Sequence, residues 1–211
     1  MAEFDPRPVT LEGRIVRLEP LAISHLDDLH EAAVRDPATW TYMPVPPPAS
    51  SDDTKRWMLD AIAERDAGRE IPFAIVERAS GRAIGSTRLL DIRRADRALE
   101  IGWTWIAPAW RRTAVNTECK LLLLRHVFDD LGAWRVQLKT DARNVTSQRA
   151  IERLGAVREG VLRRHRRCWD GHVRDTVYYA ILDREWGGVR MGVERATASG
   201  SPGNRRPEPD V

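Results

Sequence analysis

Cysteine pairs, metal-binding histidine patterns and long apolar runs are all missing from this chain of 211 residues. The two cysteines, Cys119 and Cys168, form no CxxC pair, and the histidines fall at no HExxH spacing, so we predict neither disulfides nor a metal site. No apolar stretch approaches the roughly 20 residues that a membrane helix needs, and the opening MAEFDPRPV lacks the features of a signal peptide. We therefore expect a cytoplasmic protein that binds neither metal nor membrane.

Neither sign of charge dominates, because the formal net charge is only +3. The basic residues are nearly all arginine, which favours fixed, forked contacts with anions over the mobile point charge of lysine. The most basic run, RRHRR at 163–167, would be divided between the two faces of a strand and has acidic residues nearby. A phosphorylated ligand and an ordinary solvated surface both fit this composition. Nucleic-acid binding is the less favoured interpretation, and we predict no nucleic-acid partner.

The apolar periodicity predicts one α+β domain over residues 1–195. We expect strands over 14–21, 72–78, 83–92, 98–108, 134–140, 160–169 and 172–182, and helices over 25–34, around 57–68, and over 116–131 and 144–154. The order is βααβββαβαββ, with a central antiparallel meander. Residues 196–211 contain turn formers and almost nothing to bury, which predicts a disordered tail.

The segment RRTAVN at 111–116 forms a donor-rich loop directly before the third predicted helix. A helix N-terminus carries roughly half a positive charge and up to four unpaired N–H groups, so backbone donors from Arg112 to Thr117 can surround a phosphate or pyrophosphate. The side chains of Arg111, Arg112, Thr113 and Thr117 would add further donors. The alternative is a plain helix cap with exposed arginines.

Three segments together point to a known family: LEPL at 18–21, RRTAVN at 111–116 and NVTSQRAIERLGAVREG at 144–160. They resemble the L-R-P-L opening, the Q/R-x-x-G-x-G/A loop and the N-x-x-S…L-G-F…E-G segment of the GCN5-related N-acetyltransferases (GNAT), and within them the Rim-like branch that acetylates ribosomal proteins. The resemblance spans residues 8–186. It implies the GNAT fold, a mixed, mostly antiparallel, twisted sheet of about seven strands flanked by about four helices.

The resemblance also implies acetyl-CoA as cosubstrate and an amine acceptor as partner. In this family the fourth strand ends in a bulge that exposes backbone groups to the pantetheine arm, a position that Trp105 and Ile106 hold here. The loop that cradles the pyrophosphate corresponds to Arg111, Arg112, Thr113, Ala114, Val115, Asn116 and Thr117. Asn144 is a candidate for bonding the pantetheine, and a helix cap is an equally good interpretation.

The sequence departs from the family pattern at the loop and at the last helix. Ala114 and Asn116 replace both loop glycines, and Arg112 stands where a third glycine is common. Alanine at negative φ keeps its N–H donor and asparagine tolerates left-handed geometry, so we expect coenzyme binding to persist. Ile151 replaces a tyrosine that protonates the leaving thiolate in many members. In the Rim-like branch a serine one turn earlier is thought to serve, and Ser147 matches it.

Acetyl transfer from a thioester needs a neutral amine, an oxyanion stabiliser and a proton donor for the thiolate. Strand-end N–H groups near Ile106 are candidates for the oxyanion, and Ser147 is the candidate donor. Glu100 is the candidate for drawing a proton from the amine. The simpler alternatives are a first-turn serine that bonds its own backbone and a glutamate that faces solvent or an arginine.

Aromatic residues suggest where the acceptor binds. Trp40 and Tyr42 lie in a proline-rich loop that borders the acceptor in the resembled family, and two residues apart they would share one side of an extended segment. Trp103 and Trp105 share a strand face, which core packing explains more simply.

The leading hypothesis is therefore an acetyl-CoA-dependent N-acetyltransferase that acts on a primary amine by direct attack in a ternary complex. An inactive coenzyme-A-binding sensor is the alternative, since the loop glycines and the tyrosine are missing. A basic nucleic-acid-binding protein is a third hypothesis. The sequence is compatible with a homodimer.

Overall fold

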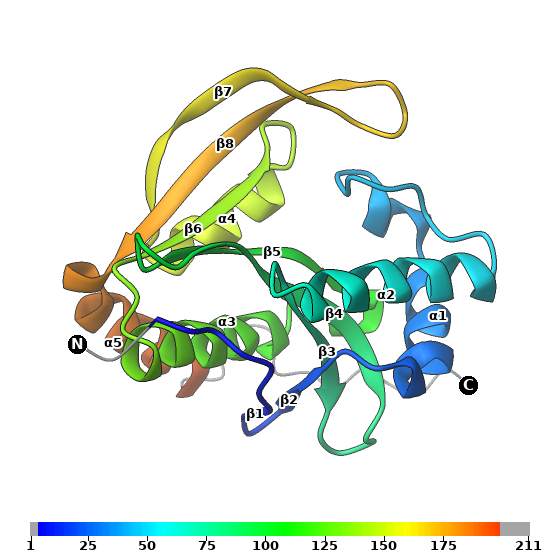
Figure 1. Cartoon of the computed structure of the whole chain (residues 1–211), viewed down its shortest axis with the longest axis horizontal. Helices are drawn as coiled ribbons and strands as arrows, with labels where there is room; N and C mark the ends of the chain where they lie inside the picture. Colours follow the sequence, from blue (N-terminus) through cyan, green and yellow to red (C-terminus); the bar gives the residue numbers. More distant parts are fainter. Residues whose placement is uncertain (1–3, 199–211) are drawn as a thin grey trace.

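Eight strands form one sheet in the computed structural model, which describes residues 4–198 (Figure 1). The strands are β1 (Leu11–Glu12), β2 (Val16–Pro20), β3 (Ile71–Glu77), β4 (Ala83–Arg93), β5 (Ala98–Ile106), β6 (Arg135–Asp141), β7 (Val157–Arg167) and β8 (Val173–Leu182). Their order across the sheet is β1-β2-β3-β4-β5-β6-β8-β7. Only the β5–β6 pair is parallel; the other neighbours are antiparallel. The predicted α+β class and mostly antiparallel sheet are confirmed.

Helices cover both faces of the sheet. They are α1 (Leu26–Val34), α2 (Ser51–Asp66), α3 (Val115–Arg125), which continues into a π-helical turn at His126–Asp130, α4 (Val145–Arg153) and α5 (Asp183–Ala198). Alternate side chains of β3 divide the core, because Phe73 and Ile75 pack with α3 and α5 whereas Ala74 and Val76 pack with α1 and α2. No helix within residues 4–198 is long and apolar enough to cross a membrane.

The structure has one strand and one helix more than the sequence pattern predicted. The extra strand is the two-residue β1, and the extra helix is α5. Trp186 holds α5 against the π-helical turn, since its ring stacks on Phe128 at 5.3 Å and its Nε1 donates to Asp129 Oδ1 at 2.6 Å. This helix includes residues 196–198, which the sequence analysis assigned to the tail. Residues 199–211 lie outside the described residues.

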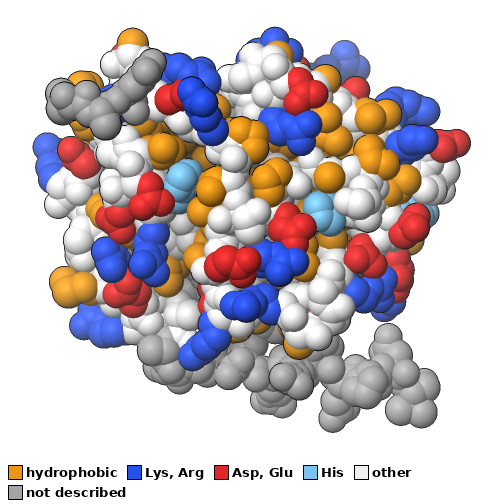
Figure 2. Space-filling model, turned by 60° about the horizontal axis from the view of Figure 1, so that its bottom comes forward, with side chains coloured by type: hydrophobic (Ala, Val, Ile, Leu, Met, Phe, Trp, Pro, Cys, Tyr) orange, Lys and Arg blue, Asp and Glu red, His pale blue; other side chains and the backbone are white. Residues whose placement is uncertain are grey.

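The surface mixes both signs of charge. Figure 2 shows one face on which Lys and Arg side chains lie beside Asp and Glu side chains. β7, which contains the RRHRR run, lies at the edge of the sheet and is exposed along its whole length. The prediction that this run lies on a solvated edge strand is confirmed.

The sheet divides in its middle, and this division positions the candidate site. β5 and β6 pair at three positions only, Ala98 with Arg135, Leu99 with Val136 and Glu100 with Gln137. The remainder of β5, Ile101–Ile106, continues along β4 instead, with a shift in register between Ser86 and Arg88. A gap therefore opens between the carboxyl ends of two parallel strands, where open α/β sheets commonly bind ligands.

Candidate active site

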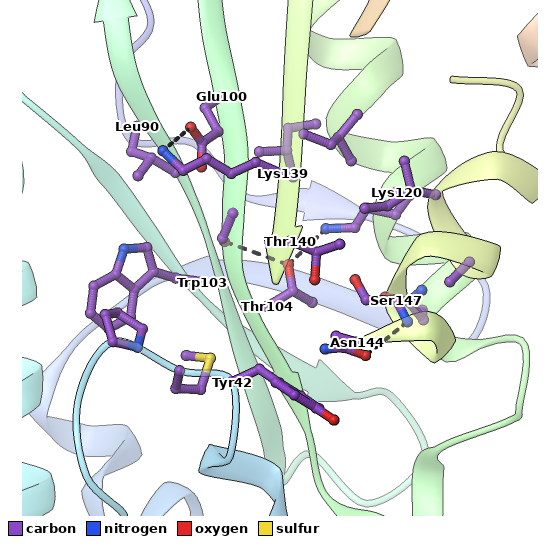
Figure 3. A pocket seen from close by; sticks show the side chains of 18 of the residues that line it. Tyr42, Leu90, Glu100, Trp103, Thr104, Lys120, Lys139, Thr140, Asn144 and Ser147 are labelled. Atoms are coloured by element: carbon purple, nitrogen blue, oxygen red, sulfur yellow. Dashed lines mark hydrogen bonds and ion pairs between the residues drawn. The ribbon is translucent and has the colours of Figure 1, made fainter. Parts of the chain in front are cut away.

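A cavity of about 250 Å³ occupies the gap between β5 and β6 (Figure 3). Five parts of the chain meet there: β5, β6, the first turns of α3, the start of α4 and the loop around Tyr42. The polar side chains that line it include Tyr42, Glu100, Thr104, Asn116, Lys120, Lys139, Thr140, Asn144 and Ser147. Residues from five separate sequence segments, most of them predicted, are thus brought together.

A β-bulge shapes the strand side of the cavity. Trp103 and Thr104 together oppose Thr87, and Trp103 has a φ of 52°. The Arg88 guanidinium lies 4.3 Å from the Trp103 ring centroid, which holds this side chain in place. Strained backbone of this kind persists where the surrounding structure determines it, and it is commonest at functional sites.

The bulge lies earlier in β5 than the sequence analysis placed it. Trp105 and Ile106 were predicted to present free backbone groups, but neither residue lines the cavity. The Ile106 carbonyl accepts from Arg111 Nε at 3.2 Å, and the next amide, Ala107 N–H, donates to the Ile84 carbonyl at 2.8 Å. The segment Gly102–Thr104 takes their place in the cavity wall.

Three tryptophans form an aromatic cluster behind the strand. The ring centroid of Trp40 lies 5.5 Å from that of Trp105 and 6.3 Å from that of Trp57. Trp40 is only 2% exposed and donates from Nε1 to the Ala33 carbonyl. Residues 37–40 form a 3-10 turn, so the two aromatic side chains do not share one side of an extended segment. Trp40 does not line this cavity but a second one, beside residues 45–49 of the proline-rich loop, and its place in the acceptor site stays a prediction. Tyr42 does line the cavity.

The N-terminus of α3 presents free donors beside the cavity. Arg112 adopts the left-handed conformation with a φ of 59°, Ala114 has a φ of −70°, and Asn116 already lies in the helix. The Thr113 hydroxyl accepts from the Val115 N–H at 3.2 Å, which leaves the Asn116 and Thr117 N–H groups without partners among the described residues. Left-handed geometry is thus needed at Arg112 rather than at Asn116.

Arg111 serves a different purpose from the one predicted. Its guanidinium donates to Asp36 Oδ2 at 2.7 Å, to the Thr39 hydroxyl and to the Ile106 carbonyl. The hydrogen bond from Arg111 holds the pKa of the Asp36 carboxyl below its usual value. Arg111 therefore fastens the proline-rich loop to the end of β5, and its contact with the pyrophosphate stays a prediction. The exposed Arg112 makes no side-chain hydrogen bond to a described residue.

Asn144 and Ser147 begin α4 at the opposite wall. The Asn144 Oδ1 accepts from the Ser147 N–H at 3.0 Å, so the helix-cap interpretation of Asn144 is correct. Its amide nitrogen points toward the cavity in Figure 3. Ser147 lines the cavity and Ile151, one turn later, lines it without a hydroxyl. The side chains of Asn144 and Ser147 thus both lie at the gap, as predicted. The cap uses only the amide oxygen of Asn144, so its amide nitrogen remains able to donate to a ligand.

Glu100 lies where β5 and β6 part. It is 2% exposed, and its Oε2 accepts from Lys139 Nζ at 2.7 Å and from Gln137 Nε2 at 3.0 Å. No described residue donates to Oε1, and the residue lines the cavity. The simpler interpretation expected Glu100 to face solvent or an arginine; instead its buried carboxylate forms an ion pair with the half-buried Lys139.

Residues 16–157 match the family model described as an acetyltransferase (GNAT) domain. The chain belongs to this family. Among curated proteins, it is 32% identical over 110 residues to YdaF of Bacillus subtilis (strain 168), named as a candidate ribosomal N-acetyltransferase. That match covers 52% of this chain and 59% of YdaF, so the chain spans about three fifths of that relative's length.

Solved GNAT structures agree over nearly the whole chain. A GCN5-related N-acetyltransferase from Brucella melitensis has a TM-score of 0.87 and 30% identity, covering 94% of this chain and 92% of that one. Mycobacterium smegmatis RimJ, solved in complex with CoA-disulfide, has a TM-score of 0.77 over 95% of this chain and 98% of its own, and at 21% identity it shows the shared fold alone. The predicted GNAT resemblance is confirmed.

Lys120 is the most deeply placed charge of this GNAT site that sequence reasoning missed, and Thr104, Lys139 and Thr140 were missed as well. It lies on α3 one turn after Asn116, is 6% exposed, and donates from Nζ to the Thr104 hydroxyl at 2.7 Å. Burial lowers the pKa of its ammonium group to about 8. The available signal was one lysine within the apolar run CKLLLL, on the helix face that the periodicity assigns to the core.

Proposed function

We propose that this GNAT protein transfers the acetyl group of acetyl-CoA to a primary amine by direct attack, with both substrates bound at once. The observation that carries the proposal is the cavity between β5 and β6, which joins unpaired helix N–H groups, a strained strand bulge and the polar start of α4. Helix N–H groups that can bind a phosphate and side chains that can transfer protons thus border the same cavity.

The proposed coenzyme-binding site lies at the N-terminus of α3. The free N–H groups of Asn116 and Thr117 add to the positive end of the helix dipole, and the exposed Arg112 guanidinium lies beside them. Ala114 supports the same role, because its negative φ shows that the loop does not require glycine there. These residues would hold the pyrophosphate, while Val115 is buried beneath them and Arg111 supports the loop indirectly.

Direct attack is favoured over a covalent enzyme intermediate. Cys119 is buried, and burial raises the pKa of its thiol to about 12, so it is protonated and shielded at neutral pH. Cys168 is buried too and does not line the cavity. In the proposed reaction Glu100 Oε1 takes up the proton that the amine loses, and the Ser147 hydroxyl donates toward the departing thiolate.

The acceptor is proposed to enter past Tyr42 and the proline-rich loop. The Arg143 guanidinium lies 5.6 Å from the Tyr42 ring centroid, and Arg111 fixes the start of the same loop. A protein N-terminus and a small-molecule amine are the two acceptor classes, and the name of YdaF supports a ribosomal protein as the first acceptor to test.

The experiment combines calorimetry with thiol release. Acetyl-CoA is first titrated into the protein, and release of free coenzyme A is then followed with N-terminal peptides of ribosomal proteins and with polyamines. We expect binding together with amine-dependent thiol release. Binding without release with any amine would identify the alternative, a coenzyme-A-binding sensor, for which Ile151 in place of a hydroxyl donor is the supporting observation. Absence of binding would contradict both functions.

A further inference from the structure

Lys120 carries a buried ammonium group in the proposed transfer cavity. Its Nζ donates to the Thr104 Oγ1 at 2.7 Å, and Thr104 Oγ1 in turn lies 2.8 Å from Thr87 Oγ1. Lys120 and Ser147 reach the same space from α3 and α4, as Figure 3 shows. The bulge in β5 thus turns Thr104 toward α3 and fixes the lysine side chain at the cavity wall.

No described carboxylate neutralises this ammonium group. The charged or titratable groups around the cavity and beside Lys120 are Glu118 and Cys119 on α3, Glu100 on β5, Lys139 on β6, Arg166 on β7, Arg174 on β8 and Tyr42 in the loop. Glu118 accepts from the backbone N–H groups of residues 14–16, and Glu100 pairs with Lys139. A buried cation without a fixed counter-charge is costly to keep, which points to an anion that arrives with the ligand.

We propose that Lys120 is the proton source that neutralises the coenzyme A thiolate as it leaves. The proposal rests on the proposed acetyl transfer and adds a residue to it. The amine nitrogen bonds to the thioester carbonyl carbon, and the carbon–sulfur bond breaks with its electron pair on sulfur. The proton of the Lys120 ammonium passes to sulfur, directly or through the Ser147 hydroxyl. The proton lost by the amine goes to Glu100, which then releases it to solvent water, and solvent water returns one proton to Lys120, so both residues regain their charge.

The acidity of the group suits this task. A serine hydroxyl gives up no proton of its own near neutral pH, so Ser147 can relay a proton only if another group supplies it. Burial lowers the pKa of Lys120 to about 8, close to the ordinary thiol pKa of about 8.5. The ammonium is therefore mostly charged at neutral pH and still transfers its proton to a thiolate at little cost.

The first test measures protons rather than turnover. Coenzyme A and desulfo-coenzyme A are titrated at pH 7.5, in buffers of different ionisation enthalpy, into the native protein and into Lys120→Met. We expect the native protein to release more protons with coenzyme A than with the desulfo analogue, because the bound sulfur and the Lys120 nitrogen would hold a single proton between them. Lys120→Met should lose this difference. Equal release by both proteins overturns the inference alone, and failure of the native protein to bind coenzyme A overturns the proposed function as well.

The second test separates a chemical role from a structural one. Lys120→Met should lower kcat by about 100-fold. It should also abolish the fall in kcat above pH 8 and raise Tm, because it removes a buried charge. Lys120→Gln provides a second neutral variant, and Lys55→Met, on the exposed surface of α2, is the matched control. A kcat within a few-fold of native in both Lys120 variants, or a pH profile that keeps its fall above pH 8, would show that Lys120 does not supply the proton.

Discussion

The hydroxyl of Ser147 faces the cavity from the first turn of α4, and its position there is set by the Asn144 cap. If it contacts the departing thiolate, Ser147→Ala should lower kcat by ~10²-fold. Affinity for acetyl-CoA should stay within a few-fold, since one neutral hydrogen bond contributes only about 0.5–1.5 kcal/mol. Steady-state kinetics and calorimetry measure the two effects separately.

Thr146→Ala is the matched control for Ser147, because Thr146 lies next to it on α4 and is exposed. The control should retain native kcat. An unchanged kcat in Ser147→Ala would mean that the thiolate leaves without this hydroxyl. A joint collapse of rate and binding would instead assign Ser147 to the structure of the helix start.

The two neighbouring arginines should differ when each is replaced. Arg112→Ala should weaken acetyl-CoA binding by about 10- to 100-fold at low salt, since a charge-assisted hydrogen bond contributes about 1.5–3 kcal/mol. Arg111→Ala should leave that affinity nearly native and raise the KM of the amine, because Arg111 fastens the loop through Asp36 and Thr39. Calorimetry and amine titrations distinguish the two. Equal effects on acetyl-CoA binding would mean that Arg111 reaches the phosphate when the coenzyme is bound.

Residue roles were predictable from the sequence where one local pattern decides them. The capping interpretation of Asn144 needed only its place at a helix start, whereas Lys120 depends on Thr104 from a distant strand. Arg111 could not be assigned because its partners, Asp36 and Thr39, are more than seventy residues away in the chain. The spacing argument for Trp40 and Tyr42 failed because a 3-10 turn replaced the extended backbone that it assumed.

At the scale of elements, α5 depends on one tryptophan. Trp186 is 6% exposed, stacks on Phe128 and bonds Asp129. Trp186→Ala should lower the free energy of unfolding by about 3–5 kcal/mol, the usual cost of removing a large buried aromatic side chain. Met191→Ala on the same helix, at a side chain 60% exposed, should change it by no more than about 0.5 kcal/mol. Urea unfolding measures both, and similar values for the two variants would show that α5 is not anchored through Trp186.

The strands and most helices were predictable because their apolar periods match what they bury. β3 to β5 follow the expected hairpins, and Gly155 ends the α4 segment with a φ of 93° as its sequence position indicated. α5 was missed because its sequence, DREWGGVRMGVERATA, is charged and glycine-rich, so its helical form depends on contacts with the π-helical turn. The bulge at Trp103 was placed wrongly because non-glycine residues give no local signal for a positive φ.

At the scale of the whole molecule, the buried charge of Lys120 should give stability an unusual dependence on pH. The pKa of Lys120 is lowered from 10.5 to about 8, so between these values the unfolded chain binds more protons than the folded one. The free energy of unfolding should therefore rise from pH 8 to pH 9 by roughly 1 kcal/mol. Chemical denaturation across this interval measures the rise.

Above pH 9 a second group opposes Lys120. Burial raises the pKa of the Cys119 thiol from 9.0 to about 12, so the unfolded chain loses that proton first, and this difference lowers stability as the pH rises. It offsets most of the further gain from Lys120, and stability falls once the pH exceeds 10.5, the ordinary pKa of that lysine. Lys120→Met should remove the rise between pH 8 and pH 9 and keep the later fall. A rise that persists in this variant would assign it to another group.

The short ladder between β5 and β6 should affect amide hydrogen exchange. The two strands share a ladder only from Ala98 to Glu100, so the N–H groups of Ile101–Thr104 that point away from β4 have no strand opposite them. Such amides should exchange quickly. The amides of β3 and β8, on either side, are paired along most of their strands and should exchange only when large parts of the sheet open. Hydrogen-exchange mass spectrometry of the free protein should therefore find fast-exchanging amides along the gap between β5 and β6, in the middle of an otherwise protected sheet. This pattern would mark the position of the cavity before any ligand has been added.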